Sequence, residues 1–365
     1  MKTIVIDARQ WSTTTGRYTN RLVQYLQKID QQHHYVILLT QKDYDSWQPT
    51  NPNFEKVVTD CKEFTLAEQW AFKRQIELLK TDLVHFGMVQ QPLFYVGKRV
   101  TTMHDLTTAR FRNPAKNPLV FTLKQQVYKF VNWYVPRRNE RIITPTEFVK
   151  KDIAAFAHVP ETRFTVTYEA ADAITDKPEP VNGLDNTASF IMYIGRPQPH
   201  KNLERLIDAF AKIRADQPAL KLVIAGKKDD LTRRLESLVE AKKLPDVLFT
   251  DFISEGQLRW LYEHTQAYVF PSLSEGFGLP GLEAMMHGAP VVSSNATCLP
   301  EVYGDAAHYF DPTNTDDMAK KILEVLTNKV LRASLIKKGT QQANKYSWQR
   351  MAEQTLEVYK QALQE

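Results

Sequence analysis

Residues 271–283 read Pro-Ser-Leu-Ser-Glu-Gly-Phe-Gly-Leu-Pro-Gly-Leu-Glu, and this stretch decides the fold class. It follows an apolar run, residues 267–270, which predicts a buried strand. It precedes residues 282–287, which predict a helix, with Pro280 near the first helical position. The order of strand, glycine-containing loop and helix is typical of parallel α/β domains.

The same stretch carries two glycines and two carboxylates that indicate a binding site. Gly276 and Gly278 allow positive φ and a close approach of the backbone. The free amides at the following helix start favour an anion such as a phosphate. Glu275 and Glu283 would repel a phosphate, but carboxylates are good acceptors for vicinal hydroxyls. Amides for a phosphate and carboxylates for a diol together indicate a pocket for a sugar nucleotide.

The spacing of the two acids resembles the Glu-x7-Glu motif of retaining GT-B glycosyltransferases of the family 4 type. The similarity continues through residues 284–292 (Ala-Met-Met-His-Gly-Ala-Pro-Val-Val) and 299–302 (Leu-Pro-Glu-Val). Upstream, residues 193–196 (Tyr-Ile-Gly-Arg) and 200–202 (His-Lys-Asn) resemble the basic, phosphate-contacting segment of that family. The resemblance covers nearly the whole chain and is densest between residues 190 and 311.

The length of 365 residues exceeds what one compact core accommodates and predicts two domains. Short apolar runs alternate with helical patterns throughout, as in parallel α/β units. The resemblance implies a GT-B fold of two Rossmann-like domains facing across a cleft, an acceptor domain over residues 1–172 and a donor domain over 173–345. Residues 346–365 predict an amphipathic helix, and the resemblance implies that it packs back on the N-terminal domain. Strands are expected near residues 3–7, 35–40, 83–86, 100–103, 141–144, 164–168, 190–194, 221–225, 247–251, 267–270, 290–293 and 308–310.

The composition, 43% apolar and 24% charged, is ordinary for a soluble globular protein. No apolar run reaches the roughly 18 residues that a membrane span needs, and the N-terminus predicts a strand rather than a secretory signal. Cys61 and Cys298 are isolated, which fits a reducing compartment. We therefore expect a cytoplasmic protein, without a nucleic-acid partner.

Two cations stand out after the predicted strand at residues 190–194. Arg196 and Lys201 lie in a loop that opens a helix. Cations and a helix N-terminus at the carboxyl end of a strand fit a phosphate, and the resemblance implies that both contact the β-phosphate of the donor. Ordinary surface charge is the alternative interpretation.

The resemblance also implies that Glu275 contacts the donor sugar and that Glu283 binds the ribose hydroxyls. Helix capping is an alternative for Glu283, but it does not explain the two glycines and the second acid. Further donor contacts are expected from the loop residues Gly276, Phe277, Gly278 and Leu279, and against the base from Asp251, Phe252 and Ile253.

Two residues of the N-terminal half complete the candidate site. His104 resembles the family's histidine that points at the donor sugar, where it would donate a hydrogen bond or assist charge development. A histidine bonded to the backbone is the alternative. The Gly16 amide is a candidate phosphate contact, although relatives usually show a glycine pair where this chain has Thr15 and Gly16. A glycine that serves turn geometry alone is the alternative.

Charge is spread unevenly along the chain. Residues 1–175 carry 24 Lys and Arg against 17 Asp and Glu, whereas the remainder carries 23 against 25. A basic N-terminal half suggests an acidic partner such as a membrane surface. Residues 110–138 interleave aromatic and basic side chains, which fits peripheral membrane contact or an anionic acceptor. An ordinary helix with solvated charges is the alternative.

These observations predict a retaining hexosyltransferase that needs no metal and no cofactor. It would move a hexose, mannose as the first choice, from a GDP-sugar or UDP-sugar to a glycan or lipid-linked acceptor in polysaccharide biosynthesis. The catalytic residues would be His104, Arg196, Lys201 and Glu275. Asp43-Tyr-Asp45 matches a metal-binding tripeptide of another glycosyltransferase fold, but it lies in an expected loop and no metal site is predicted from it. The alternatives are a sugar-nucleotide epimerase and a non-catalytic sugar-nucleotide-binding partner of a glycan assembly complex.

Overall fold

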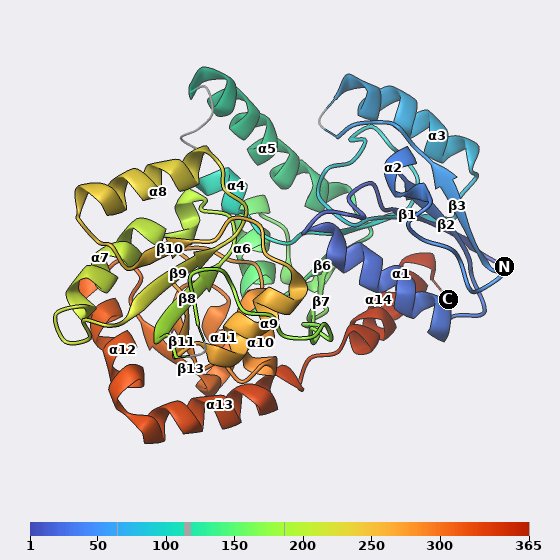
Figure 1. Ribbon diagram of the computed structural model, residues 1–365. Coiled ribbons are helices and arrows are strands. Elements are labelled where there is room, and N and C mark those ends of the chain that lie inside the picture. The colour runs from blue at the N-terminus through green and yellow to red at the C-terminus, as the bar shows by residue number, and fades with distance from the viewer. Residues whose placement is uncertain (64, 113–117, 186, 365) are drawn as a thin grey trace. The chain divides into compact units, whose positions relative to one another are not determined.

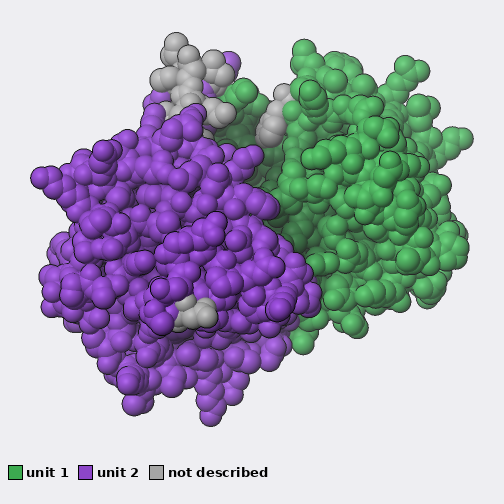
Figure 2. Space-filling view, viewed as in Figure 1, with its two compact units in different colours: residues 1–109, 124–169, 347–365 green, residues 110–123, 170–346 purple. Residues whose placement is uncertain are grey.

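The computed structural model describes residues 1–63, 65–112, 118–185 and 187–364 (Figure 1). The chain divides into two compact units (Figure 2). Unit 1 comprises Met1–Ala109, Lys124–Glu169 and Ser347–Glu365, and unit 2 comprises Arg110–Leu123 and Ala170–Tyr346. A parallel sheet with helices lies in each unit, so the predicted α/β class with two Rossmann-like domains is confirmed.

The sheet of unit 1 has the order β3-β2-β1-β4-β5-β6-β7, with all its pairs parallel. Its strands are β1 (Thr3–Asp7), β2 (His34–Leu39), β3 (Phe54–Val58), β4 (Leu83–Phe86), β5 (Arg99–Thr102), β6 (Arg141–Thr144) and β7 (Phe164–Val166). The helices of this part of the chain are α1 (Gly16–Ile29), α2 (Gln41–Tyr44), the π-helical turn η1 (Glu68–Phe72), α3 (Lys73–Leu78), α4 (Thr107–Arg110), α5 (Pro118–Arg138), α6 (Glu147–Ala157), the 3-10 turn η2 (Glu161–Arg163) and α14 (Trp348–Leu363).

Helix α14 packs against α1 and against three strands of the unit 1 sheet (Figure 1). Its buried face includes Trp348, Met351, Thr355 and Tyr359, at the spacing of an amphipathic helix. The last helix of the chain therefore belongs to the same unit as the first strand. This packing buries the apolar face of α14, which would otherwise be exposed to water.

The sheet of unit 2 has the order β10-β9-β8-β11-β12-β13 and is also parallel. Its strands are β8 (Phe190–Ile194), β9 (Lys221–Ala225), β10 (Val247–Phe249), β11 (Ala267–Phe270), β12 (Val291–Ser294) and β13 (Ala307–Phe310). Its helices are the 3-10 turn η3 (Pro199–Lys201), α7 (Leu203–Ile213), α8 (Asp230–Ala241), α9 (Glu255–His264), α10 (Leu279–Met286), α11 (Leu299–Tyr303), the 3-10 turn η4 (Gly304–Ala306), α12 (Thr315–Thr327) and α13 (Lys329–Ala343).

The strand orders place a topological switch point in each sheet. In unit 1 the chain runs outward from β1 to β3 and then returns to β4 on the other side of β1. In unit 2 it runs from β8 to β10 and returns to β11 beside β8. Parallel α/β sheets bind ligands at the carboxyl ends of strands where the order reverses. A ligand site is therefore expected after β8 and β11, and after β1 and β4.

Two features differ from the sequence-based expectation. Strand β3 was not predicted, although each predicted strand is present with small shifts at its ends. The N-terminal domain was expected to run without interruption from residue 1 to 172, whereas residues 110–123 group with unit 2. The Phe111 ring lies 5.8 Å from the His200 ring, which ties this segment to unit 2.

Candidate functional site

The switch point of unit 2 brings together two loops that are distant in sequence. One follows β8 and contains Arg196 and Lys201, and the other follows β11 and contains Glu275. The Leu273 amide donates to the His200 carbonyl oxygen at 2.7 Å, so the two loops are bonded backbone to backbone. The order of the strands therefore assembles, at one edge of the sheet, residues that the sequence keeps far apart.

Lys201 and Glu275 form an ion pair at the centre of this arrangement. The Lys201 Nζ donates to the Glu275 Oε1 at 2.6 Å, and the two side chains are 21% and 12% exposed. The ammonium also lies 5.7 Å from the centre of the Phe270 ring, at the end of β11. A partly desolvated cation is screened less by water than an exposed one, so a phosphate that displaced the carboxylate would interact with it strongly. The structure thus joins two of the predicted catalytic residues.

Asn202 fixes the loop that carries Lys201. Its backbone adopts φ of 61°, which asparagine tolerates better than most residues, and it precedes the first residue of α7. Its side-chain amide donates to the carbonyl oxygens of Pro271 and Pro312, at 3.0 and 2.8 Å. Arg205 Nη1 donates to the Asn202 Oδ1 at 2.8 Å. A single buried side chain therefore links three loops and positions the neighbouring lysine.

Helix α10 begins one residue after Gly278, whose φ is 95°. A Cβ atom at this position would lie 2.5 Å from the Tyr303 Oη, which itself donates to the Gly278 carbonyl oxygen at 2.6 Å. Only glycine fits both the backbone conformation and the space. The helix starts at Leu279, earlier than the sequence analysis expected, so Glu283 lies beyond its first turn.

Glu283 and Phe277 face the interior of unit 2. Glu283 is 8% exposed, and its Oε2 accepts a hydrogen bond from the Tyr262 hydroxyl at 3.4 Å. The Phe277 ring is buried, with its edge toward Tyr346 at 5.5 Å between ring centres. Gly276 lies in the same loop, two residues before Gly278.

Arg196 lies on the other side of β8 from the ion pair, toward the loop after β9. Its guanidinium is 72% exposed and donates to the Asp229 Oδ2 at 3.2 Å. Burial alone would raise the pKa of Asp229, but the Thr232 backbone amide and the Arg196 guanidinium lower it. The structure therefore gives the two predicted phosphate-binding cations different carboxylate partners.

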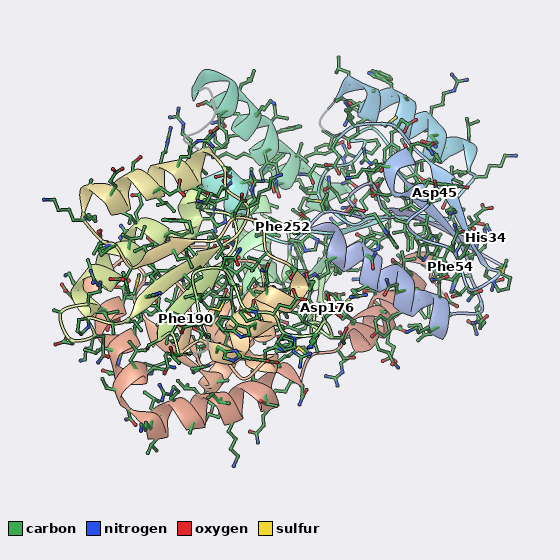
Figure 3. The ribbon with its side chains drawn as sticks, viewed as in Figure 1. His34, Asp45, Phe54, Asp176, Phe190 and Phe252 are labelled. Carbon is green, nitrogen blue, oxygen red and sulfur yellow. The ribbon has the colours of Figure 1, made fainter. Side chains whose placement is uncertain are left out.

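The predicted base-binding residues follow β10. Asp251 has φ of 68° and forms an isolated backbone bridge with Gly226, in the loop after β9. Its Oδ1 accepts a hydrogen bond from the Lys228 amide at 2.9 Å, which lowers the pKa of the carboxyl. Phe252, labelled in Figure 3, is 79% exposed, and Ile253 is half-buried. An exposed aromatic ring beside a lysine-containing loop suits stacking against a planar, charged ligand.

At the switch point of unit 1, both ring nitrogens of His104 already have protein partners. The Nε2 lies 3.0 Å from the Gly87 carbonyl oxygen, after β4, and the Nδ1 lies 3.1 Å from the Glu169 Oε1. The Tyr18 ring meets the imidazole edge-on, with 5.1 Å between centres. This arrangement is the backbone-bonded alternative of the sequence analysis. A ring nitrogen is open to a sugar hydroxyl only if one of these bonds is exchanged.

The geometry of its turn explains the glycine at position 16. A Cβ atom there would lie 1.7 Å from the Gln10 carbonyl oxygen, so no other residue fits. The Gly16 amide donates to the Thr13 Oγ1 at 3.0 Å. A phosphate could therefore bind the Gly16 amide only if the hydrogen bond to Thr13 were broken. The observed contacts match the alternative interpretation, in which the glycine serves the geometry of the turn.

The acidic tripeptide at residues 43–45 is part of α2 and the turn after it. The Asp43 carboxylate is buried and accepts hydrogen bonds from the hydroxyls of Ser12 and Thr40. These contacts give Asp43 a local structural role at the end of β2.

Helix α5 carries most of the basic and aromatic segment that the sequence analysis singled out. Val127, Phe130 and Trp133 are exposed on it, and the Phe130 ring lies 6.0 Å from the Trp133 ring. The Arg137 guanidinium stacks 3.8 Å from the Trp133 ring centre. Residues 113–117, which include Lys116, lie outside the described residues. Within the described ranges, no helix is both long enough and apolar enough to cross a bilayer.

Comparison with known proteins identifies the family. The family model of glycosyl transferases group 1 matches residues 175–342, and that of glycosyltransferase family 4 matches residues 15–173. O-antigen chain mannosyltransferase B of Escherichia coli is 31% identical over 297 residues, which is 76% of this chain and 74% of the relative. The chain belongs to glycosyltransferase family 4. The resemblance seen in the motifs around Glu275 and Glu283 is thereby confirmed.

Other proteins are similar to this glycosyltransferase over different extents. The serotype-specific mannosyltransferase WbdA of Escherichia coli is 29% identical over 249 residues, which is 67% of this chain but 29% of WbdA. Sucrose-phosphate synthase of Thermosynechococcus elongatus has a TM-score of 0.78 at 18% identity and covers 99% of both chains. HepE of Anabaena, solved with UDP and glucose, has a TM-score of 0.73 at 16% identity over 98% of this chain and 99% of its own. The structural likeness confirms the GT-B fold.

Sequence reasoning assigned no role to three polar residues near the two switch points of this glycosyltransferase. Glu169, which pairs with His104, belongs to no recognised motif. The hydroxyls of Tyr193 and Ser272, at the ends of β8 and after β11, are buried and have no hydrogen-bond partner among the described residues. Buried hydroxyls at the carboxyl ends of strands are available to a ligand or an ordered water. Tyr193 and Ser272 lie in stretches that the sequence analysis quotes, but only the tertiary packing shows that their hydroxyls are buried without a partner among the described residues.

Proposed function

We propose that this glycosyltransferase moves a hexose, mannose as the first choice, from a nucleoside-diphosphate sugar to a glycan acceptor with retention at the anomeric carbon. The observation that carries the proposal is the Lys201–Glu275 ion pair at the switch point between β8 and β11. It offers a cation for a phosphate and a carboxylate for sugar hydroxyls within one contact. Relatives named as O-antigen chain and serotype-specific mannosyltransferases support mannose and a polysaccharide acceptor.

In the proposed reaction the acceptor hydroxyl attacks the anomeric carbon on the face from which the diphosphate departs. The new glycosidic C–O bond forms as the sugar–phosphate C–O bond breaks. The leaving phosphate oxygen takes the proton of the acceptor hydroxyl, so no protein base is required. Lys201, Arg196 and the first amides of α10 would hold the developing negative charge. Glu275 would bind hydroxyls of the sugar, and Glu283 would bind those of the ribose.

Release of Lys201 from Glu275 would accompany donor binding. In the structure the two groups neutralise one another at 2.6 Å. A diphosphate would compete with the carboxylate for the ammonium, which frees Glu275 to accept hydrogen bonds from the sugar. The pair would thus keep both charges in place until the donor arrives.

The donor nucleotide is tested first by thermal stabilisation with GDP, UDP and ADP, each at several concentrations. A nucleotide at 100 times its Kd should stabilise the protein by about 2.7 kcal/mol. GDP is the expected ligand, while UDP, which HepE binds, is the second choice. Stabilisation by none of the three would overturn the assignment of the donor site.

Transfer is tested with the GDP-sugar or UDP-sugar that the first experiment selects and with a mannose-terminated oligosaccharide. The expected product is an α-linked extension with the anomeric configuration of the donor, detected by NMR. We expect equal activity with EDTA, because the proposed charge stabilisation comes from the chain itself. Interconversion of the sugar nucleotide without transfer would indicate an epimerase, and binding without hydrolysis or transfer would indicate a non-catalytic partner.

We also propose that α5 rests on an anionic membrane surface. The exposed Val127, Phe130 and Trp133 supply apolar contact, and Arg137 and its neighbours supply positive charge. Flotation with vesicles that contain phosphatidylglycerol should recover the protein, whereas the double variant F130A/W133A should remain largely unbound. Equal recovery of both proteins would refute membrane contact through this helix.

A further inference from the structure

Unit 1 contains two histidines that both contact Tyr18, a buried His85 and a partly buried His104, and the structure gives them opposite hydrogen-bond environments. His85 lies on β4, and His104 lies just beyond the end of β5. Tyr18 of α1 contacts both rings edge-on, with centre distances of 6.3 Å to His85 and 5.1 Å to His104. The partners of each ring decide how many protons it carries.

Every partner of the His85 ring is a hydroxyl. The Tyr359 hydroxyl lies 2.5 Å from the Nδ1, and the Thr102 Oγ1 lies 2.9 Å from the Nε2. Thr102 donates onward to the Tyr18 Oη at 2.9 Å. The Thr102 oxygen therefore accepts from the Nε2–H, and the Nδ1 is free to accept from Tyr359. The chain of bonds is complete with a neutral ring, and burial together with the charge of His104 lowers the pKa of His85 to about 3.

The partners of the His104 ring are acceptors. The Gly87 carbonyl oxygen, 3.0 Å from the Nε2, can only accept, so the Nε2 carries a hydrogen. The Glu169 Oε1 lies 3.1 Å from the Nδ1. One further proton can be shared in this contact, on either the carboxylate or the Nδ1. The Glu169 side chain is 8% exposed, so water screens this contact poorly. The position of that one proton decides whether the ring is a cation.

The titratable groups around the His104 ring are Glu169 after β7, Asp105 beside it in the chain, Tyr18 of α1 and His85 of β4. Burial alone would lower the pKa of His104. The hydrogen bond and the charge of Glu169, with smaller contributions from the Gly87 carbonyl and Asp105, raise it above the ordinary value. Two of the four neighbours are carboxylates, and the other histidine is held neutral.

We propose that Glu169 is a positioning residue that keeps His104 as a doubly protonated imidazolium, with its ring fixed between the Glu169 carboxylate and the Gly87 carbonyl oxygen. This inference rests on the proposed function, together with the expectation from the family resemblance that His104 lies at the donor sugar. It assigns His104 the role of a fixed positive charge, because a ring with both nitrogens protonated cannot accept a proton from the acceptor hydroxyl. Glu169 acts through His104 and makes no contact with substrate itself.

The protonation state is measured directly by NMR of protein with isotope-labelled histidine, titrated from pH 5 to 9. The chain has nine histidines, so the spectrum of H104Q identifies the resonance of His104. We expect the wild-type ring to remain protonated at pH 7. In E169Q the ring should titrate at least about one pH unit lower, a tenfold loss of proton affinity. A neutral His104 at pH 7 in the wild-type protein would overturn the proposal, whether or not E169Q folds.

The pH profile of activity separates a charge effect from a structural one. At pH 8, E169Q should have a kcat at least about tenfold below wild type, with the donor KM changed less than about threefold. The kcat deficit of E169Q relative to wild type should be smaller at pH 6, because a lower pH favours protonation of the ring without Glu169. E169D should restore most of the activity. A deficit of E169Q that is the same at pH 6 and pH 8 would show that the residue only supports the fold.

Two controls complete the experiment. E161Q makes the same replacement at an exposed glutamate of η2 and should match wild type at every pH. In the H104Q background, E169Q should have no further effect on kcat, because its partner is gone. The NMR titration does not depend on glycosyl transfer. Failure to detect transfer with any donor would therefore count against the proposed function and leave the assignment of the proton intact.

Discussion

Lys201 is the residue on which the proposed chemistry depends most directly, since its ammonium already holds a carboxylate at 2.6 Å and would exchange it for a phosphate. We predict that K201A lowers kcat by about 10² to 10³, the usual cost of removing one group that stabilises developing charge. The thermal unfolding temperature should also fall, because K201A leaves the Glu275 carboxylate, which is 12% exposed, without this partner. Steady-state kinetics with the selected donor provide the measurement.

A matched lysine is available for comparison with Lys201. Lys212, on α7, forms a surface ion pair with Asp316 and lies away from the switch point. K212A should retain wild-type kcat, since exposed pairs contribute less than about 1 kcal/mol. If K201A and K212A have the same activity, Lys201 has no part in the reaction and the proposed role is wrong.

For single residues, the sequence predicted which residue types the candidate site contains, but not which other residues they contact. The glycine-containing loop and the basic segment pointed to Glu275 and Lys201 because phosphate and diol recognition require those residue types. It did not foresee that they would bond to each other, nor that Arg196 would pair with Asp229. For Gly16 and His104, the alternatives kept open in the sequence analysis describe the observed contacts.

At the scale of elements, the start of α10 depends on one glycine. Gly278 and Gly288 both have positive φ, 95° and 74°, so alanine at either position carries a similar backbone strain. A Cβ at Gly278 would meet the Tyr303 Oη at 2.5 Å and the Leu299 Cδ2 at 2.8 Å, whereas at Gly288 nothing lies within 4 Å. We predict that G278A is less stable than G288A by about 1–3 kcal/mol, the range for overpacking.

Thermal unfolding of the two variants tests this difference. For domains of this size we expect G278A to unfold at least about 2–4 °C below G288A. Stabilisation by the donor nucleotide should be weakened in G278A and retained in G288A, because only the first change displaces the loop before α10. Equal unfolding temperatures would mean that the Tyr303 ring moves aside without cost.

Strand β3 shows why one element escaped prediction. Its sequence, Phe-Glu-Lys-Val-Val, places two charges beside each other in a short run. The strand lies at the edge of the sheet, where charged residues are tolerated and protect the edge from pairing with other chains. Tertiary contacts hold it: it pairs with β2 along its whole length, and the Phe54 ring, labelled in Figure 3, stacks on the Tyr35 ring of β2 at 4.3 Å. A short edge strand with two adjacent charges has little periodicity to detect.

At the scale of the whole molecule, the buried His85 makes the stability of unit 1 depend on pH. The pKa of His85 is about 3 in the folded protein and near 6.5 in an unfolded chain. As the pH falls below about 6.5, the unfolded state takes up a proton that the folded state excludes. The contribution of His85 to the free energy of unfolding is therefore fully present above pH 6.5. It decreases by about 1.4 kcal/mol for each pH unit between pH 6.5 and pH 3.

We predict that H85N flattens this acid dependence. The variant should be less stable than wild type at pH 7.5, because it disturbs the hydrogen bonds to Tyr359 and Thr102. The difference in unfolding temperature between the two proteins should become smaller toward pH 5. Unfolding temperatures at fixed ionic strength give the comparison. H34N, at a partly exposed histidine of β2, should keep the wild-type dependence. A gap between H85N and wild type that stays constant with pH would mean that His85 binds a proton in the folded state.

The sequence by itself determined the α/β class, the strands of both sheets apart from β3, and the loop chemistry that indicates a sugar nucleotide. These follow from local physics: hydrophobic period, glycine conformations and the free amides of helix starts. Only the tertiary structure decided which groups touch. Lys201 and Glu275 are 74 residues apart, and His104 and Glu169 are 65 apart. The first pair forms because the order of the unit 2 sheet reverses between β8 and β11, and the second forms because β5 and β7 end at the same edge of the unit 1 sheet. No local pattern in the chain encodes either arrangement.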